Sequence, residues 1–586
     1  MVLNQKINKS LNRFFEKTRY SESMFIIILS IVVGLTTGLG AVAFRWLILT
    51  CRDFFFGSIP FASSISGFQR DWFIPFIPMI GGLLVGPIVF KYAREARGHG
   101  VPEVMSSVAL KGGIIRPRVS IAKSIASAIC IGSGGSAGRE GPIVQIGSAI
   151  GSTFGQMFRL SSNRIKVLVG CGAAAGISAV FNAPIAGVLF ALEIILGDFT
   201  IKTFSPVIIS SVLASVVSRF FLGNSPAFDV PGYSLVSAWE MPMYAILGAF
   251  AGIVAAFFIK SLYFTEDLFE KWKIPDIIKP GIGGLILGLT GLLTPQIFSD
   301  GYEAISTALH GNMIWLIMIT LVFMKILATS LTLGSGNSGG IFAPSLFMGA
   351  MAGGFFGTII NYLFPGVTAP PAAYALVGMG AVVAGTTHAT ITSILIVFEM
   401  TGDYRIMLPM MIATVFATLV SHRLSKYSIY TLKLARQGIK IKAGKDIDLL
   451  SEIKVSEVME KDFRTIPPHL TFSGIMRMME DSKDTTFPVV EKDRLYGMLS
   501  FQDLRTILTK PVLPALIIAS DIATRNVLTV TKDENLNQAL QKFGHKDLDM
   551  MPVVEKSDPS KIIGILRRSD LMSFYNMRLM EKMAKS

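Results

Sequence analysis

The chain has 586 residues, of which 51% are hydrophobic and only 16% are charged, and its formal net charge is +14. Soluble domains carry about 25% charged residues, so this composition excludes a wholly soluble globular protein. The positive charge fits anchoring at anionic lipid, and no module of basic and aromatic residues points to nucleic acid. We therefore expect an integral membrane protein with a soluble part.

The N-terminal leader, residues 1–23, is polar and rich in lysine and arginine. The apolar stretch after it is too long for a cleaved signal peptide. Basic residues also follow the apolar region, between 433 and 445. Because positive flanks face the cytoplasm, we expect both termini there, an even number of crossings, and residence in the plasma (inner) membrane.

Residues 24–435 are expected to form the membrane domain, because uncharged apolar runs recur through them. The longest run extends from 326 to 398 and is full of glycine and proline. A spanning helix needs roughly 20 apolar residues. The run is therefore expected to hold several helices, some of them broken, in an all-α polytopic fold.

This region contains an internal repeat. The segment GSGGSAGREGPIVQIGSAIG at Gly132 aligns with GSGNSGGIFAPSLFMGAMAG at Gly334, a shift of 202 (334 − 132). A second match follows in the same order, with VGCGA at Val169 and VGMGA at Val377. Two matches in one order predict two related halves, and transporters of that kind place their sites where the halves meet.

Both repeat segments place a Gly/Ser loop before an apolar helix. Irregular backbone survives inside a bilayer only where protein encloses it, and the N-terminus of a helix suits an anion. A third such loop is GHGVP, residues 98–102. We expect an anion site built from helix ends, because a bare lysine or arginine would hold an anion too tightly to release it.

Glu140 stands inside this glycine-rich segment. An ionisable residue in a membrane segment is functional by default, and a carboxylate at an anion site can occupy the site itself until it is protonated. We therefore interpret Glu140 as a gate and a potential proton carrier. The alternative is a structural ion pair with Arg139, which adjacent residues on a helix form poorly; Arg139 is expected to cap the helix or to snorkel.

These motifs resemble the CLC family of chloride channels and anion/proton exchangers, whose hallmarks GSGIP, GREGP and GxFxP correspond to GHGVP, GREGP and GIFAP here. The resemblance implies two inverted-repeat halves and a homodimer with one pore per subunit. It implies that Glu140 gates. It places the central anion at the amides of Ile341 and Phe342 and the hydroxyl of Tyr430, and further anion contacts at His99, Gly100, Arg139 and Gly141.

Two departures from the family pattern bear on the function. His99 stands where many members have an anion-binding serine, so it either donates to the anion or turns away, which leaves selectivity and pH dependence open. Ile194 stands where many exchangers have an inner proton-accepting glutamate. The neighbouring Glu193 has a repeat mate, Glu399, and this symmetry favours a structural role for both.

The tail resembles a tandem pair of CBS domains, small α/β units expected over 455–509 and 518–580 after a linker at 436–454. The segments TFPVV and GMLSFQDL of the first copy match DMMPVV and GILRRSDL of the second. Such pairs often bind an adenine nucleotide, for which the resemblance implies Ser500, Asp503, Arg567 and Asp570. The alternative is a tail that only stabilises the dimer.

The sequence therefore predicts transport of chloride or a similar small anion, with a lean towards a passive channel because of Ile194. The alternative is a proton-coupled exchanger on the same scaffold. A CBS-bearing cation transporter is a remote alternative, because acidic side chains are sparse in the membrane region. No enzyme motif or metal-ligand spacing is visible, and no cofactor is required.

Overall fold

The structure, a computed structural model, describes residues 22–57, 73–233, 235–437, 439, 441–442, 445–446, 450, 453–480, 482, 484–501, 503–504, 517–525, 527–546 and 548–585. The chain divides into two compact units, Met1–Lys445 and Asp446–Ser586. Each unit is described on its own. The predicted leader lies outside the described residues except for its last two, and so does much of the predicted linker.

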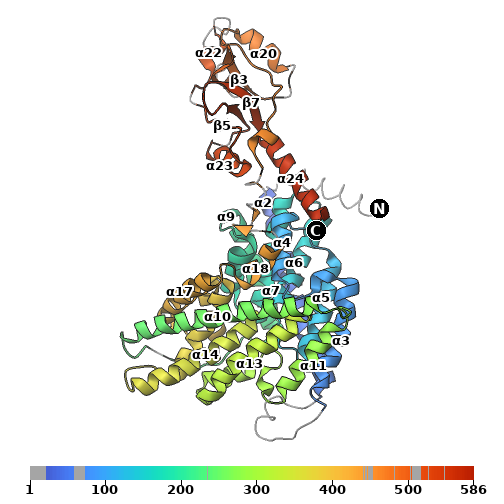
Figure 1. Cartoon of the computed structure of the whole chain (residues 1–586), viewed down its shortest axis with the longest axis vertical. Coiled ribbons are helices and arrows are strands. Elements are labelled where there is room, and N and C mark those ends of the chain that lie inside the picture. Colours follow the sequence, from blue (N-terminus) through green and yellow to red (C-terminus); the bar gives the residue numbers. More distant parts are fainter. Residues whose placement is uncertain are drawn as a thin grey trace. The chain divides into compact units, whose positions relative to one another are not determined.

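The first unit is helical in its described part up to Arg436, and the short strand β1 (Ile441–Lys442) follows (Figure 1). The elements of its first half are α2 (Glu22–Phe56), α3 (Phe76–Pro87), η2 (Ile88–Tyr92), η3 (Arg94–Ala96), α4 (Val101–Leu110), α5 (Pro117–Gly132), α6 (Glu140–Met157), α7 (Ser162–Phe181), α8 (Pro184–Phe190), η4 (Ala191–Leu196) and α9 (Ile201–Leu222). Those of its second half are α10 (Glu240–Lys271), α11 (Lys279–Gly291), η5 (Pro295–Ile297), α12 (Tyr302–Leu309), α13 (Trp315–Gly334), α14 (Phe342–Leu363), α15 (Pro371–Thr387), α16 (Thr390–Thr401) and α17 (Met407–Leu424), and α18 (Ile429–Arg436) follows.

The order of helices in the first half recurs in the second. The long α2 corresponds to α10, and α6, which begins at Glu140, corresponds to α14, which begins at Phe342. The short α4 and α12 begin at Val101 and Tyr302, each directly after a glycine of positive φ. The repeat seen in two sequence blocks therefore extends through the whole membrane unit.

Length and apolar surface both suit a bilayer. Seven helices of the described chain are long and apolar enough to cross a membrane, and several shorter apolar helices accompany them. Large apolar side chains stay exposed on α9 and α17, such as Phe220 at 82% and Leu408 at 65%. The uncharged run 326–398 holds the end of α13, all of α14 and α15, and most of α16, which confirms the prediction of several helices there.

Helices α6 and α7 cross so closely that their contact leaves room only for glycine. A Cβ on Gly172 would lie 1.9 Å from the carbonyl oxygen of Gly147, and one on Gly147 would lie 2.1 Å from that of Gly172. The corresponding crossing of α14 and α15 has Gly349 and Gly378 in the same relation, at 2.4 Å. These glycines are packing residues, and the crossings hold α6 and α14 in place.

The second unit contains two small sheets, one in each CBS copy, and each copy pairs a segment with the sheet of the other. Strands β3 (Thr486–Glu491) and β4 (Arg494–Ser500) pair antiparallel, and β5 (Val530–Thr531), β6 (Met550–Val554) and β7 (Ile562–Arg567) form the other sheet. The helices are α20 (Phe472–Glu480), α22 (Ala519–Ile522), α23 (Leu536–Lys546) and α24 (Arg568–Lys585). Glu460 of the first copy pairs with Ile565, and Thr524 of the second pairs with Met498. The two copies are thus hydrogen-bonded into one unit.

Substitution Gly172→Ala should test the close crossing. Its methyl group would overlap the backbone of α6, and overpacking of this kind costs about 1–3 kcal/mol. We expect a clearly lower unfolding temperature in detergent, measured by size-exclusion chromatography after heating. Gly40→Ala is the matched control, because a Cβ on that helical glycine meets only Ile150 Cδ1 at 3.7 Å. Equal melting of the two variants would contradict the packing argument.

Candidate functional site

The glycine-rich loops of the two halves pair with each other through their backbones. The amide of Gly138 donates to the carbonyl of Gly340 at 2.8 Å, and the amide of Gly340 donates back to Gly138 at 2.6 Å. Beside this pair, the amide of Gly98 donates to Asn337 at 3.0 Å, and that of Gly339 donates to Gly98 at 3.3 Å. All three predicted loops therefore meet in one place.

Glycine is required at this junction because backbones and the Glu140 side chain lie in contact. A Cβ on Gly141 would lie 2.2 Å from the carbonyl oxygen of His99, and one on Gly138 would lie 2.0 Å from Glu140 Oε2. Gly100 has a φ of +82°, which other residues rarely adopt. The loops thus carry the helix N-termini of α4, α6 and α14 close together.

The Glu140 side chain lies at the start of α14. Its carboxylate oxygen Oε2 accepts the backbone N–H of Ala343 at 3.4 Å, and Oε1 accepts the hydroxyl of Tyr302 at 3.0 Å. The residue is only 1% exposed, and Ile341 and Phe342 beside it are buried. A negative group thus occupies the N-terminal end of a helix from the other half, where free amides favour an anion.

Arg139 is the N-cap residue of α6, but its side chain makes no cap hydrogen bond to that helix. The guanidinium lies instead at the Tyr302 ring, with its Cζ 5.1 Å from the ring centre. Its Nε is buried without a hydrogen-bond partner. A cation over an aromatic face is attracted by the negative face of the ring, so Arg139 packs against the residue that contacts Glu140.

His99 and Tyr430 lie together on the other side of the loops. Their ring centres are 5.7 Å apart, both residues are buried, and His99 Nδ1 is buried without a partner. Tyr430 is the second residue of α18, whose start is fixed by a capping box between Ser428 and Thr431. The structure therefore brings the first predicted motif and the predicted tyrosine to one place, as an anion contact requires.

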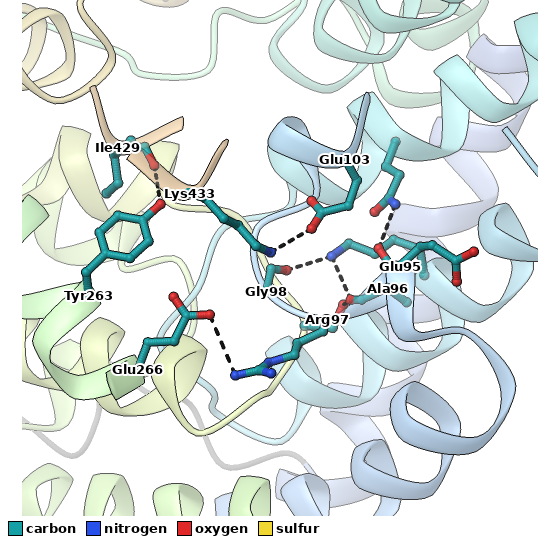
Figure 2. A network of polar contacts seen from close by, with 12 residues as sticks. Glu95, Ala96, Arg97, Gly98, Glu103, Tyr263, Glu266, Ile429 and Lys433 are labelled. Atoms are coloured by element: carbon teal, nitrogen blue, oxygen red, sulfur yellow. Dashed lines mark hydrogen bonds and ion pairs between the residues drawn. The ribbon is translucent and has the colours of Figure 1, made fainter. Parts of the chain in front are cut away.

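A charged cavity of about 470 Å³ adjoins this place. It is lined by basic and acidic side chains together, including Arg97 and Glu103, which stand on either side of the His99 loop. Figure 2 shows Lys433 reaching Glu103 and Arg97 reaching Glu266, at 2.6 and 3.6 Å. The cavity wall thus combines ion pairs around the loop that carries His99 with the apolar side chains of Val89 and Phe90.

Two fully buried lysines hold the loops from behind. Lys123 donates to the carbonyls of Ala96 and Gly98, at 3.0 and 2.7 Å. Lys325 donates to the carbonyls of Ile297 and Ser299, at 2.9 and 3.0 Å. Each lysine anchors the segment that precedes a short helix, α4 in one half and α12 in the other.

Glu193 and Glu399 hold the two halves together by exchanged helix caps. Glu193 Oε2 accepts both the amide and the hydroxyl of Thr392 at the start of α16, at 2.9 and 2.6 Å. Glu399 accepts the amides of Ile185 and Ala186 at the start of α8, at 3.0 and 2.7 Å. This reciprocal arrangement is a structural role, the one that the repeat symmetry favours.

The position of the absent inner glutamate is occupied by an apolar side chain. Ile194 is half-buried in η4 and packs against the hydrophobic core of the membrane unit. Its neighbour Glu193 is already engaged by α16. Position 194 therefore offers no carboxylate, and the carboxylate of Glu193 is already hydrogen-bonded.

In the second unit, the residues predicted to bind a nucleotide make hydrogen bonds and ion pairs within the protein. Asp503 accepts the amide and the hydroxyl of Ser500, at 2.8 and 2.6 Å. Arg567 instead pairs with carboxylates, with Asp484 at 3.0 Å, with Asp570 at 3.4 Å and with Glu460. Burial alone would lower the pKa of Arg567, but its bonds to Asp484 and Glu460 outweigh burial and raise it. The cation therefore stays charged, and carboxylates of the protein already balance its charge.

The comparisons with known proteins decide the family. The family described as voltage gated chloride channel (CLC) matches residues 81–422, and the CBS domain matches residues 455–510 and 519–576. The chain belongs to the CLC family. It is 34% identical over 409 residues to a protein of Ralstonia nicotianae named as a ClcB-like chloride channel protein, covering 69% of this chain and 95% of that one.

The chain is also similar to a protein named as an exchanger and to a solved structure. The H(+)/Cl(-) exchange transporter ClcA of Salmonella paratyphi B is 34% identical over 420 residues, which are 70% of this chain and 88% of the relative. The crystal structure of a slow cyanobacterial Cl-/H+ antiporter matches with a TM-score of 0.62 and 27% identity, over 70% of this chain and 97% of that one. The predicted CLC membrane fold with a CBS pair is thus confirmed.

Sequence reasoning missed several residues of this site, among them Tyr302, Lys123 and Lys325. The lysines carried a usable signal, since they are separated by 202 residues (325 − 123), the shift of the repeat. A lysine retained in both halves of an apolar domain indicates a structural demand common to both. Tyr302 carried no comparable signal, because its partner Glu140 is 162 residues away in the sequence.

The exchanged caps predict that Glu399→Gln destabilises the membrane unit more than Glu193→Gln does. Both oxygens of Glu399 accept backbone N–H groups, so a glutamine must turn its NH₂ towards one of them and leave it unpaired, at about 1–3 kcal/mol. Glu193 uses one oxygen, which glutamine can retain. Thermal unfolding in detergent measures the difference; loss of proton coupling in a stable Glu193→Gln variant would contradict the structural role.

Proposed function

We propose that this chain exchanges chloride or a similar small anion for protons across its membrane, with Glu140 as the group that blocks the anion path and carries the proton. The single observation that carries the proposal is the position of the Glu140 carboxylate, which accepts the amide of Ala343 at the N-terminus of α14. An anion arriving there competes with the carboxylate for the same donors, and protonation weakens the hold of the carboxylate on them.

Exchange is preferred to passive conduction because of the relatives. The Salmonella protein is named as an exchange transporter and the cyanobacterial structure as an antiporter, whereas Ile194 led the sequence to favour a channel. The observation that supports the passive alternative is still Ile194, an apolar side chain where many exchangers have a glutamate. The two functions share the anion path and differ only in whether protons move.

The inner part of the path is proposed to run from the charged cavity past His99 to Tyr430. His99 Nδ1 is buried and unpartnered, and an imidazole N–H is a suitable donor to an anion. The ion pairs of Lys433 with Glu103 and of Arg97 with Glu266 partly balance the positive charge in the charged cavity. A partly balanced positive charge attracts anions while it still allows them to leave.

The assembly and the tail are proposals as well. The exposed apolar side chains of α9 and α17 are suited either to lipid or to a second copy of the chain, and the family resemblance favours a homodimer. An adenine nucleotide at the CBS pair stays a prediction. It draws support from the Ser500 and Asp503 pair and loses support from the ion pairs of Arg567.

Purified protein in liposomes tests exchange directly. Vesicles are loaded with concentrated chloride, the membrane voltage is clamped with a potassium ionophore, and chloride and pH electrodes record the external solution. We expect chloride efflux to drive proton uptake, so that the weakly buffered external solution becomes alkaline. Chloride efflux with no pH change would instead establish the passive channel.

The same assay on Glu140→Gln tests the role of the carboxylate. Glutamine is neutral at all pH values and has nearly the shape of glutamate. We expect anion flux to persist while proton uptake falls at least tenfold and the dependence of flux on pH disappears. A variant that still couples protons to chloride would show that another group carries them.

A further inference from the structure

The second hydrogen bond of Glu140 comes from outside the anion-binding backbone. Tyr302, the first residue of α12, donates its hydroxyl to Oε1 at 3.0 Å, while the amide of Ala343 reaches the other oxygen at 3.4 Å. An anion that displaces Glu140 from α14 replaces only the Ala343 contact. The Tyr302 contact has to break for a different reason, so it is an independent restraint on the carboxylate.

The Tyr302 ring is fixed by its neighbours. The guanidinium of Arg139 lies over this ring, with its Cζ 5.1 Å from the ring centre. The ring of Phe228 packs edge-on, with centres 5.2 Å apart. Because these contacts hold the ring on α12, the hydroxyl cannot follow Glu140 when the carboxylate swings away.

The backbone position of Tyr302 is set by the buried lysine of the second half. Lys325 holds the carbonyls of Ile297 and Ser299, and its ammonium lies 4.9 Å from the centre of the Phe347 ring. Gly301 follows with a φ of +77°, and a Cβ there would lie 2.6 Å from Phe347. Loop, lysine and α14 are thus packed into one rigid support for Tyr302.

We propose that Tyr302 is a latch that holds the ionised Glu140 carboxylate in its blocking position, and that Lys325 sets where the latch stands. The proposal rests on the gating role proposed for Glu140. A hydroxyl donates to a carboxylate more strongly than it interacts with a neutral carboxyl group, so the latch favours the ionised, blocking form. Tyr302 is therefore a positioning residue that determines the pH at which the gate clears.

The other groups around Glu140 are consistent with this assignment. The titratable or charged side chains that act on the carboxylate or on its immediate partners are Arg139, Asp300, Tyr302, Tyr430 and Arg45. Among them, the only one whose hydroxyl or N–H is hydrogen-bonded to Glu140 within the described chain is Tyr302. Removing that hydroxyl takes away its hydrogen bond to Glu140 and its side-chain contact with Arg139, and it leaves the charges in place.

The test compares Tyr302→Phe with the wild type in chloride-loaded liposomes over a range of pH. A hydrogen bond to a charged group shifts an equilibrium about tenfold or more. We expect the pH of half-maximal anion flux to rise by about one unit, with faster flux at neutral pH. An unchanged pH profile would overturn the latch.

Tyr233→Phe is the matched control. Its hydroxyl donates to the carbonyl of Leu309 at 2.8 Å, so it restrains the far end of the same helix α12 without touching Glu140. We expect its pH profile to match the wild type. A shift equal to that of Tyr302→Phe would mean that loosening α12 is sufficient, and would overturn the assignment of Tyr302.

Two further variants separate this proposal from the proposed function. Adding Tyr302→Phe to Glu140→Gln should change nothing further, because the carboxylate is gone. If Glu140→Gln alone retains its pH dependence, the proposed function fails; if it loses it and Tyr302→Phe is silent, only the latch fails. Lys325→Met, which releases the loop, should shift the profile in the same direction as Tyr302→Phe, and a wild-type profile would contradict its role.

Discussion

The membrane unit depends on one constraint: backbone N–H and C=O groups inside a bilayer have no water to pair with. Helices broken in mid-membrane are stable only if the exposed groups find partners in the protein. Here Gly138 and Gly340 exchange two hydrogen bonds between the halves, and the loop at Gly98 joins them. At the start of α14 the amide of Ala343 meets the Glu140 carboxylate, because the N-terminus of a helix favours a negative group.

The same constraint explains why buried lysines accompany an anion path without binding the anion themselves. Lys123 and Lys325 direct their ammonium groups at backbone carbonyls behind the loops, so their charge is engaged by the protein. In both halves a buried lysine anchors a loop, but the two loops present different residues. The anchored loop of the first half presents His99 beside Tyr430, and that of the second half presents Tyr302 to Glu140.

Much of this could be predicted from the sequence, because its signals are local or periodic. The uncharged runs, the repeat and the GREGP segment gave the membrane domain, its two halves and the junction of the loops. The contacts of Arg139 and Tyr302 could not be predicted, because they depend on where an arginine side chain turns and on a tyrosine far along the chain. The caps of Glu193 and Glu399 could be predicted in part. The sequence repeat shows that the two glutamates correspond, but it does not show which backbone groups they bind.

The engagement of Glu193 sharpens the question of proton coupling. An exchanger has to pass protons between Glu140 and the inner solution. Glu193 cannot carry them without giving up the start of α16, and Ile194 has no group to titrate. Glu103, which lines the charged cavity, is engaged in an ion pair with Lys433 at 2.6 Å. The proposed proton exchange would then have to use groups other than Glu193 and Ile194, whereas anion movement needs only that Glu140 move aside.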